Sequence, residues 1–300
     1  MTESRLTENP TASNTEQQPA IVVGIDSSDN AARAAAWAAR EADERGLALI
    51  LVHAVDLPGG AGPAAEPPGW ANARREDGQK LLDRVQSSLQ EQFPGLSITA
   101  EVADFSAAKS LVVMSGHAQF VVTGTRGHGG FAGLLLGSVS LKVAAHAQCP
   151  VVIVRGDEAG EVRNEIVLGV EPEQPEAPIR FAFATAARLG AKVRVVRTWE
   201  PDPMYGGYYY ADDTQSVEQR MADDVDALLK PMRDEFPGVE VSVRLVSGNT
   251  VPVLIEAARG ARLLVVGAHR RRTPLSVGVG HVTHGLLSHS PTPVAVVPIA

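Results

Sequence analysis

The chain of 300 residues is 44% hydrophobic and 21% charged, the composition of a folded globular protein with room for one large domain or two ordinary ones. A formal net charge of −8 argues against broad electrostatic attraction to nucleic acid or to an anionic membrane, so an anionic ligand needs a local site. The sequence has neither a bilayer-length apolar run nor a signal-peptide core, and its single cysteine, Cys149, excludes an intrachain disulfide, so we expect a cytoplasmic protein without membrane partners.

Residues 1–19 are rich in Thr, Ser, Asn, Gln and Pro and are expected to form a disordered tail. After them, short β-branched runs alternate with longer stretches of helical periodicity, as in βαβ units. The first half predicts strands at residues 21–26, 47–55, 97–103, 118–123 and 150–154, and helices at residues 29–46, 70–93, 106–117 and 137–147. The strand segments are nearly continuous hydrophobic runs, which are typical of a parallel sheet covered by helices on both faces.

The second half of the chain repeats the first at an offset of 143 to 145 residues. The segment AIVVGID returns as EIVLGVE, EQFPG as DEFPG, FVVTGT as LLVVGA and CPVVIV as TPVAVV. We therefore predict two tandem three-layer α/β/α domains, at residues 20–156 and 164–300, each with a five-stranded parallel sheet. Ligands of such sheets bind at the carboxyl ends of the strands, where the strand order reverses.

A glycine-rich segment at residues 121–140 lies between a predicted strand and a predicted helix. Its spacing is Gly-x2-Gly-x9-Gly-Ser, formed by Gly124, Gly127, Gly137 and Ser138. This is neither a Walker A loop nor the Rossmann G-x-G-x-x-G pattern, but glycines and a helix N-terminus both suit phosphate oxygens. Arg126 and His128 could add local positive charge. The alternative interpretation is a long loop with an ordinary helix cap.

With this motif the chain resembles the universal stress protein family, specifically its tandem members of the ATP-binding subgroup, which carry the same glycine and serine spacing. The segments GIDSS, HAV and CPVVIV extend the resemblance to residues 20–300. It implies a fold like that of the adenine-nucleotide α-hydrolases, with a ribose near Asp26 and an adenine bordered by Ala54 and Val55. The nucleotide contacts that it implies are Gly24, Asp26, Ala54, Val55, Gly124, Thr125, Arg126, Gly127, His128, Gly129, Gly130, Gly137, Ser138 and Val139. In the family the fifth strands pair domains, so the two halves could pair within the chain, and two chains are expected to form a homodimer.

The segment DSSDN at residues 26–30 has two interpretations. Asp26 follows the first predicted strand, where a carboxylate can accept hydrogen bonds from ribose hydroxyls. The same cluster of Asp, Ser and Asn is also typical of a helix N-cap, and both roles could coexist.

The second half departs from the motif. Gly267 and Gly280 remain, but Arg270 replaces the middle glycine, His281 replaces the serine, and Glu171 replaces Asp26. Because a Cβ atom and a long side chain obstruct the approach of the backbone to phosphate, the second site is expected to be weak or unable to bind ATP. The opposite possibility is that residues 270–272, three arginines, clamp phosphate by charge.

Two further clusters in the second half are open to a plain structural interpretation. His281 and His284 lie three residues apart on the last predicted helix, so they share a face and could bind a metal together with a third ligand. The alternative is that they are helix-cap and surface residues, which requires no further ligand. The tyrosines of residues 204–210 could form a lid, a contact surface or a partly buried loop.

The sequence has no nucleophile elbow, no H-E-x-x-H motif, no kinase signature and no P-loop lysine. We therefore expect an ATP-binding regulatory or sensor module of the stress response, with or without Mg²⁺, that hydrolyses ATP weakly at most. The alternatives are a slow ATPase or nucleotidyl-transfer enzyme, and a structural scaffold that binds no nucleotide.

Overall fold

The computed structural model describes residues 19–57, 69–125, 127, 136–155, 162–200, 211–269 and 279–299, which alternate strands and helices as the sequence predicts. The first half contains β1 (Ala20–Gly24), α1 (Asp29–Arg45), β2 (Ala48–Ala54), α2 (Trp70–Gln92), β3 (Ile98–Ala103), α3 (Ala107–Met114), β4 (Phe120–Gly124), α4 (Ser138–His146) and β5 (Val151–Val154). The second half contains β6 (Arg163–Gly169), α5 (Glu176–Leu189), β7 (Lys192–Trp199), α6 (Ala211–Glu235), β8 (Val241–Ser247), α7 (Thr250–Ala258), β9 (Ala261–His269), α8 (His281–His289) and β10 (Val294–Ile299). The predicted tail and the tyrosine-rich segment lie outside the described residues, apart from residue 19.

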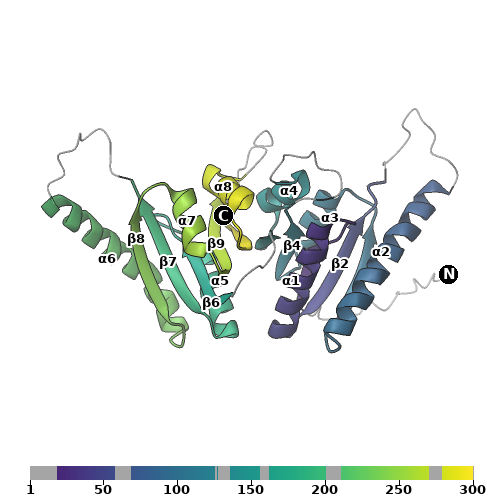
Figure 1. Ribbon diagram of the computed structural model, residues 1–300, viewed down its shortest axis with the longest axis horizontal. Helices are drawn as coiled ribbons and strands as arrows, with labels where there is room; N and C mark the ends of the chain where they lie inside the picture. Colours follow the sequence, from purple (N-terminus) through teal and green to yellow (C-terminus); the bar gives the residue numbers. More distant parts are fainter. Residues whose placement is uncertain are drawn as a thin grey trace, which may run out of the picture.

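The strands form one ten-stranded sheet in the order β3-β2-β1-β4-β5-β10-β9-β6-β7-β8 (Figure 1). Every neighbouring pair within a half is parallel, so each half contains the predicted five-stranded parallel sheet. The strand order reverses between β1 and β4 in the first half, and between β6 and β9 in the second. In open sheets of this kind, ligands bind at the carboxyl ends of the strands at such reversals.

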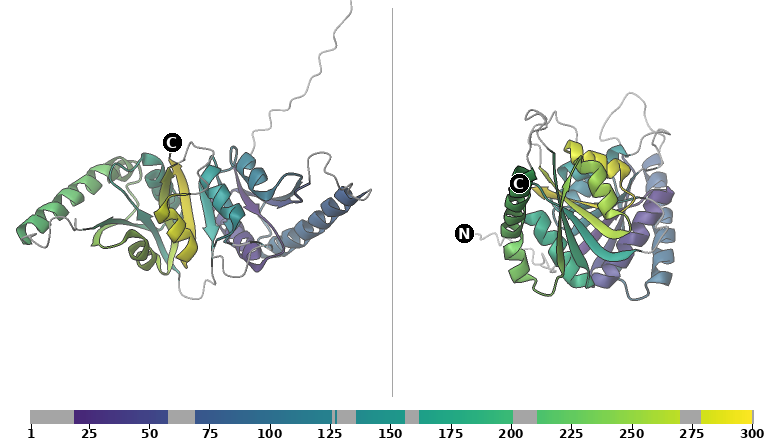
Figure 2. Two further views of the ribbon diagram at one scale, coloured as in Figure 1. Left: turned by 90° about the horizontal axis from the view of Figure 1, so that it is seen from above. Right: turned by 60° about the vertical axis from the view of Figure 1, so that its left-hand side comes forward.

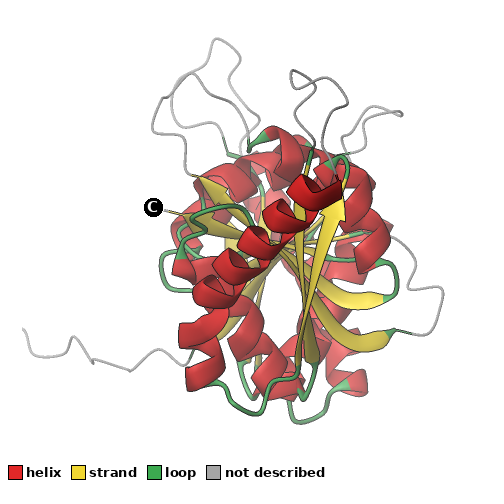
Figure 3. Cartoon of the chain, turned by 90° about the vertical axis from the view of Figure 1, so that its left-hand side faces the viewer, coloured by secondary structure: helices red, strands yellow, loops and turns green. Residues whose placement is uncertain are grey.

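Helices cover both faces of the sheet (Figures 2 and 3). One apolar cluster lies between the sheet and helices α1, α2, α5 and α6. The other lies between the sheet and helices α3, α4, α7 and α8, and it contains the buried Cys149. Burial on both faces explains why the strands are continuously hydrophobic instead of alternating. Among the described helices, none combines the length and apolarity needed to cross a bilayer.

The two halves join where β5 and β10 pair antiparallel, with Val152 opposite Ala295. The two strands lie side by side at the centre of the molecule in Figure 2. An aromatic contact accompanies this pairing, since the ring of Phe120 on β4 lies edge-on to Phe181 of α5, with 6.3 Å between ring centres. The fifth strands are therefore interior strands of one continuous sheet.

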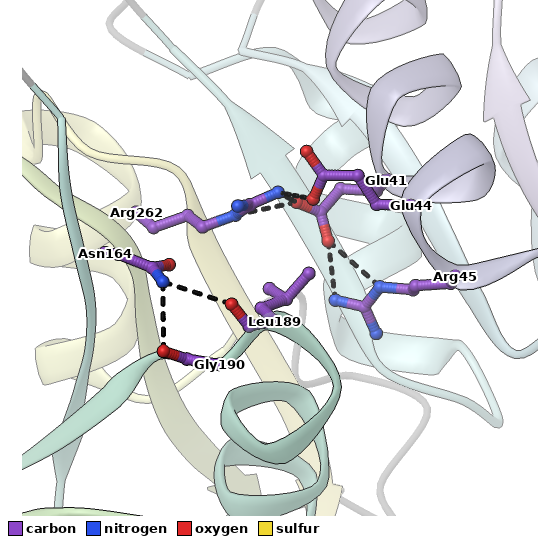
Figure 4. A network of polar contacts seen from close by, with 7 residues as sticks. All are labelled: Glu41, Glu44, Arg45, Asn164, Leu189, Gly190 and Arg262. Carbon is purple, nitrogen blue, oxygen red and sulfur yellow. Dashed lines mark hydrogen bonds and ion pairs between the residues drawn. The ribbon is translucent and has the colours of Figure 1, made fainter.

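An ion-pair network also connects the halves (Figure 4). Arg262, at the start of β9, donates from Nε and Nη2 to Oε1 of Glu41 on α1, at 3.1 and 2.7 Å, and it also pairs with Glu44. The second oxygen of Glu41 accepts from Arg45 at 2.6 Å. Burial alone would lower the pKa of the Arg262 guanidinium, but its attraction to Glu41 and its hydrogen bonds to both carboxylates raise that pKa above the ordinary value. The guanidinium is therefore charged across the physiological pH range.

Candidate functional site

The carboxyl ends of β1 and β4 bring Asp26 and Gly127 together at the reversal of strand order. A Cβ atom on Gly127 would lie 2.3 Å from Oδ2 of Asp26, which is closer than any real side chain approaches an oxygen. The predicted middle glycine of the motif therefore lies directly against the predicted ribose ligand. Only a residue without a side chain allows this approach, because even alanine would displace the carboxylate.

Asp26 is also tied to the start of α1. Its Oδ1 accepts hydrogen bonds from the backbone N–H of Ser28 at 2.9 Å and from the Ser28 hydroxyl at 2.5 Å. Ser28 is itself the N-cap, since its Oγ accepts from the N–H of Ala31 at 3.2 Å. The two interpretations of the segment DSSDN thus fall on different residues: Ser28 caps the helix, and Asp26 orients the cap while its second oxygen faces Gly127.

Hydrogen bonds hold the two ends of the glycine-rich loop together. The N–H of Gly137 donates to the carbonyl of Thr125 at 2.7 Å, and the Ser140 hydroxyl donates to the carbonyl of Gly124 at the same distance. Thr125 is 2% exposed, so the exit from β4 is buried. A Cβ atom on Gly124 would lie 2.8 Å from backbone atoms of Asn30, and this glycine therefore lets β4 and α1 touch.

Helix α4 begins at the end of this loop, as predicted. Gly137 is its N-cap in an extended conformation, and no side chain of the described residues caps the helix. Ser138 is the first helical residue and is exposed. An α-helix leaves its first four N–H groups without helical partners and places the positive end of its dipole there. The arrangement can therefore bind an anion at the mouth of the loop.

Three of the other predicted contacts lie at the ends of neighbouring strands, and Val139 lies on α4. Ala54 ends β2, and Val55, 3% exposed, follows it with its N–H bonded to the carbonyl of Ala103. Gly24 ends β1, where a Cβ atom would lie 2.9 Å from Leu111 of α3. Val139 packs against the apolar cluster under α3 and α4. The remaining four predicted contacts, Arg126, His128, Gly129 and Gly130, lie outside the described residues.

Three residues of this region were not predicted as site residues: Asn30, His53 and Ser140. Each of them contacts backbone atoms of a residue that is distant in the sequence, so no local spacing of residues indicates its role. His53 belongs to the segment HAV, which carries part of the family resemblance, and its ring Nδ1 lies 2.9 Å from the carbonyl of Ile25.

In the second half, side chains pack against Gly267, the glycine that corresponds to Gly124. A Cβ atom on Gly267 would lie 2.5 Å from Ile299 and 2.6 Å from Nε2 of Gln174, so side chains occupy the space next to this glycine. The carboxylate of Glu171 is paired with Nε2 of His269 at 3.2 Å. Residues 270–272 lie outside the described residues, which leaves the arginine clamp a prediction.

The predicted histidine pair lies at the start of α8. Gly280 is the N-cap, His281 is the first helical residue, and His281 and His284 are both exposed. Among the described residues, no group of three His, Cys, Asp or Glu side chains could hold a metal ion. The histidine pair has no third ligand in this part of the chain.

Comparison with known proteins agrees with this architecture. The model of the universal stress protein family matches residues 19–155 and again residues 163–298. A universal stress protein of Mycobacterium tuberculosis is 30% identical over 288 residues, which cover 92% of this chain and 95% of the relative. Another, from Mycolicibacterium smegmatis, is 29% identical over 290 residues, covering 92% of this chain and 96% of the relative. The crystal structure of a universal stress protein from Archaeoglobus fulgidus shares the fold, with a TM-score of 0.70 and 17% identity, and covers 94% of this chain and 99% of its own. Two family matches, one for each half and together spanning nearly all of the sequence, show that the chain belongs to the universal stress protein family.

Proposed function

We propose that the first half binds ATP and that the protein is a nucleotide-dependent regulatory module of the stress response. The observation that carries this proposal is the contact between Asp26 and Gly127, where a backbone without a side chain lies against a carboxylate at the reversal of strand order. A carboxylate there suits the hydroxyls of a ribose, and an exposed helix start one loop away suits phosphates.

The residues present fit such a ligand at each end. Asp26 would accept hydrogen bonds from the ribose, and Ala54 and Val55 would border the adenine. The N–H groups at Gly137 and Ser138 would hold phosphate oxygens, with the Ser138 hydroxyl as a further donor. Bound Mg²⁺ would neutralise part of the phosphate charge.

The chemistry of the described residues favours binding over turnover. Asp26 is held by Ser28 and faces Gly127, and the site offers N–H and hydroxyl donors at the phosphate end. None of these groups is a general base directed at a phosphate, and the sequence supplies no P-loop lysine. Hydrolysis of ATP is therefore expected to be weak at most.

Isothermal titration of ATP with Mg²⁺ tests the proposal. We expect one tight site per chain in the wild-type protein and none in Gly127→Glu, because that change puts bulk and negative charge against Asp26. Gly95→Glu is the matched control, since a Cβ atom at Gly95 meets nothing within 4 Å and the same charge is introduced. A wild-type protein that does not bind ATP, or a Gly127→Glu variant that binds like the control, would overturn it.

The second half is proposed to contribute little affinity for ATP. Arg270 and His281 replace the middle glycine and the serine of the motif, and Glu171, in the place of Asp26, is paired with His269. A stoichiometry of one per chain follows from this. Two sites of equal affinity would instead favour the arginine clamp.

We also propose that two chains form a homodimer in the cytoplasm. Because β5 and β10 pair with each other, a contact between chains must use another surface than the fifth strands. Light scattering of the purified protein measures the assembly, and a mass of one chain at all accessible concentrations would refute it.

A further inference from the structure

The end of β1 is fastened to β2 by two successive contacts. The N–H of Ile25 donates to the carbonyl of Val52 at 2.8 Å, which is the backbone bond. One residue further, ring Nδ1 of His53 lies 2.9 Å from the carbonyl of Ile25. Since a carbonyl only accepts, His53 must carry its proton on Nδ1 and donate it. This carbonyl belongs to the peptide bond between Ile25 and Asp26.

Helix α2 presses the imidazole into this position. Gly78 of α2 is buried, and a Cβ atom there would lie 2.7 Å from Cδ2 of His53 and 3.4 Å from Cγ1 of Val55. Glycine in a helix interior costs about 1 kcal/mol relative to alanine, so its presence needs a reason in packing. Here the reason is the space that the His53 ring occupies.

The duplication supplies an internal comparison for this arrangement. The register of β1 with β2 places Val52 opposite Gly24, and the register of β6 with β7 places Val196 opposite Gly169, so Arg197 occupies the place of His53. The repeat offset places Met221 where α2 has Gly78. The side chain of Arg197 reaches α6 instead, where it donates to the carbonyl of Met221 at 3.3 Å.

The histidine and the glycine are thus present together in the half that keeps the motif and Asp26, and both are replaced in the half that has lost them. Among the hydrogen bonds of the described residues, those of the Arg197 side chain go to the carbonyl of Met221 and to Asp224 on α6, and none goes to the end of β6. This separates the role of His53 in the site from a general need of the fold.

We infer that His53 is a positioning residue of the first-half site: it holds the carbonyl of Ile25 and thereby fixes Asp26 against Gly127 for the nucleotide. Gly78 is the space that makes this possible. The inference rests on the proposed function, because it concerns the affinity for the ribose end of ATP. It assigns His53 no contact with the ligand.

Titration of ATP with Mg²⁺ into a series of variants tests the inference. His53→Leu removes the donor and keeps much of the volume, and we expect about a tenfold loss of affinity, the effect of one net hydrogen bond. His53→Asn places an amide N–H close to the position of Nδ1 and should restore affinity to within about threefold of the wild type. The rescue distinguishes a positioning hydrogen bond from mere filling of space.

A second variant approaches the ring from the other side. Gly78→Ala keeps the histidine in the sequence, but the new Cβ atom displaces the imidazole ring, so the affinity for ATP should fall several-fold. Gly95→Ala adds a Cβ atom in open space and should leave the affinity unchanged. Urea unfolding of each variant confirms that the protein titrated is folded.

The outcomes separate this inference from the proposed function. If the wild type does not bind ATP, the proposed function fails and the inference with it. If the wild type binds and His53→Leu binds equally well, or if His53→Asn loses as much affinity as His53→Leu, the site stands and the inference is overturned.

Discussion

The ion-pair network between the halves predicts a measurable loss of stability when Arg262 is replaced by methionine. Methionine keeps an apolar stem of similar reach but removes the charge that faces Glu41 and Glu44. The Glu41 side chain is 3% exposed, so the change leaves a buried carboxylate with one cationic partner instead of two.

The magnitude follows from the exposure of the groups. Removing one partner of a fully buried pair costs about 3–5 kcal/mol. Arg262 is 20% exposed and Glu41 keeps its bond to Arg45, so we expect about 2 kcal/mol, within the usual range for a partly compensated buried charge. With a slope of about 3 kcal/mol per molar urea, the unfolding midpoint moves down by roughly 0.7 M.

Urea unfolding followed by circular dichroism measures this shift, and Arg259→Met provides the control. Arg259 is close in sequence, and its pair with Glu256 is exposed on both sides, so its loss should cost at most about 1 kcal/mol. If Arg262→Met and Arg259→Met unfold at the same midpoint, the network does not stabilise the contact between the halves and the reasoning is wrong.

Three other expectations follow from single contacts. Gly127→Ala should weaken ATP binding by about ten- to a hundredfold, measured by titration calorimetry, because its Cβ atom displaces the Asp26 carboxylate; unchanged affinity would contradict the contact. Gly124→Ala should lower the free energy of unfolding by about 1–3 kcal/mol in scanning calorimetry, since its Cβ atom meets the backbone of α1; a neutral change would mean that the helix can shift freely. The hydrogen bond from Arg75 holds the pKa of Asp104 below its ordinary value, so this exposed pair stabilises the fold above about pH 4 and its contribution disappears as the pH falls further. The difference in unfolding midpoint between the wild type and Arg75→Gln should therefore be small at neutral pH and vanish in acid; a difference that grows in acid would reverse the assignment.

The regular elements could be predicted because they depend on local pattern, and so could the reversal of strand order at which the site is proposed. Continuous apolar runs between amphipathic segments identify parallel strands, and the strand-order rule then indicates where β1 and β4 diverge. The helix that begins at Ser138 could also be predicted from local pattern, because a glycine followed by a serine after a loop is typical of a helix start.

What escaped prediction depends on tertiary contacts. Nothing near His53 in the sequence indicates that its ring donates to Ile25, because the bond joins residues that are 28 positions apart. The close approach of Gly124 to Asn30 likewise becomes visible only when β4 lies against α1. The antiparallel direction of β5 and β10 follows from how the second half is placed on the first, and no spacing in either half encodes it.

The pairing of β5 with β10 fixes the composition of the assembled sheet. When separate domains associate through a shared strand edge, the rate and the yield of pairing depend on concentration. Two copies of the same domain then form a pair of identical halves. Here the linkage of the halves in one chain makes that encounter intramolecular. Each sheet therefore contains one half with the complete glycine motif and one with the altered motif, at any expression level. Because the altered half stays covalently linked to the other, the residues at its strand ends can depart from the motif while its strands still complete the sheet.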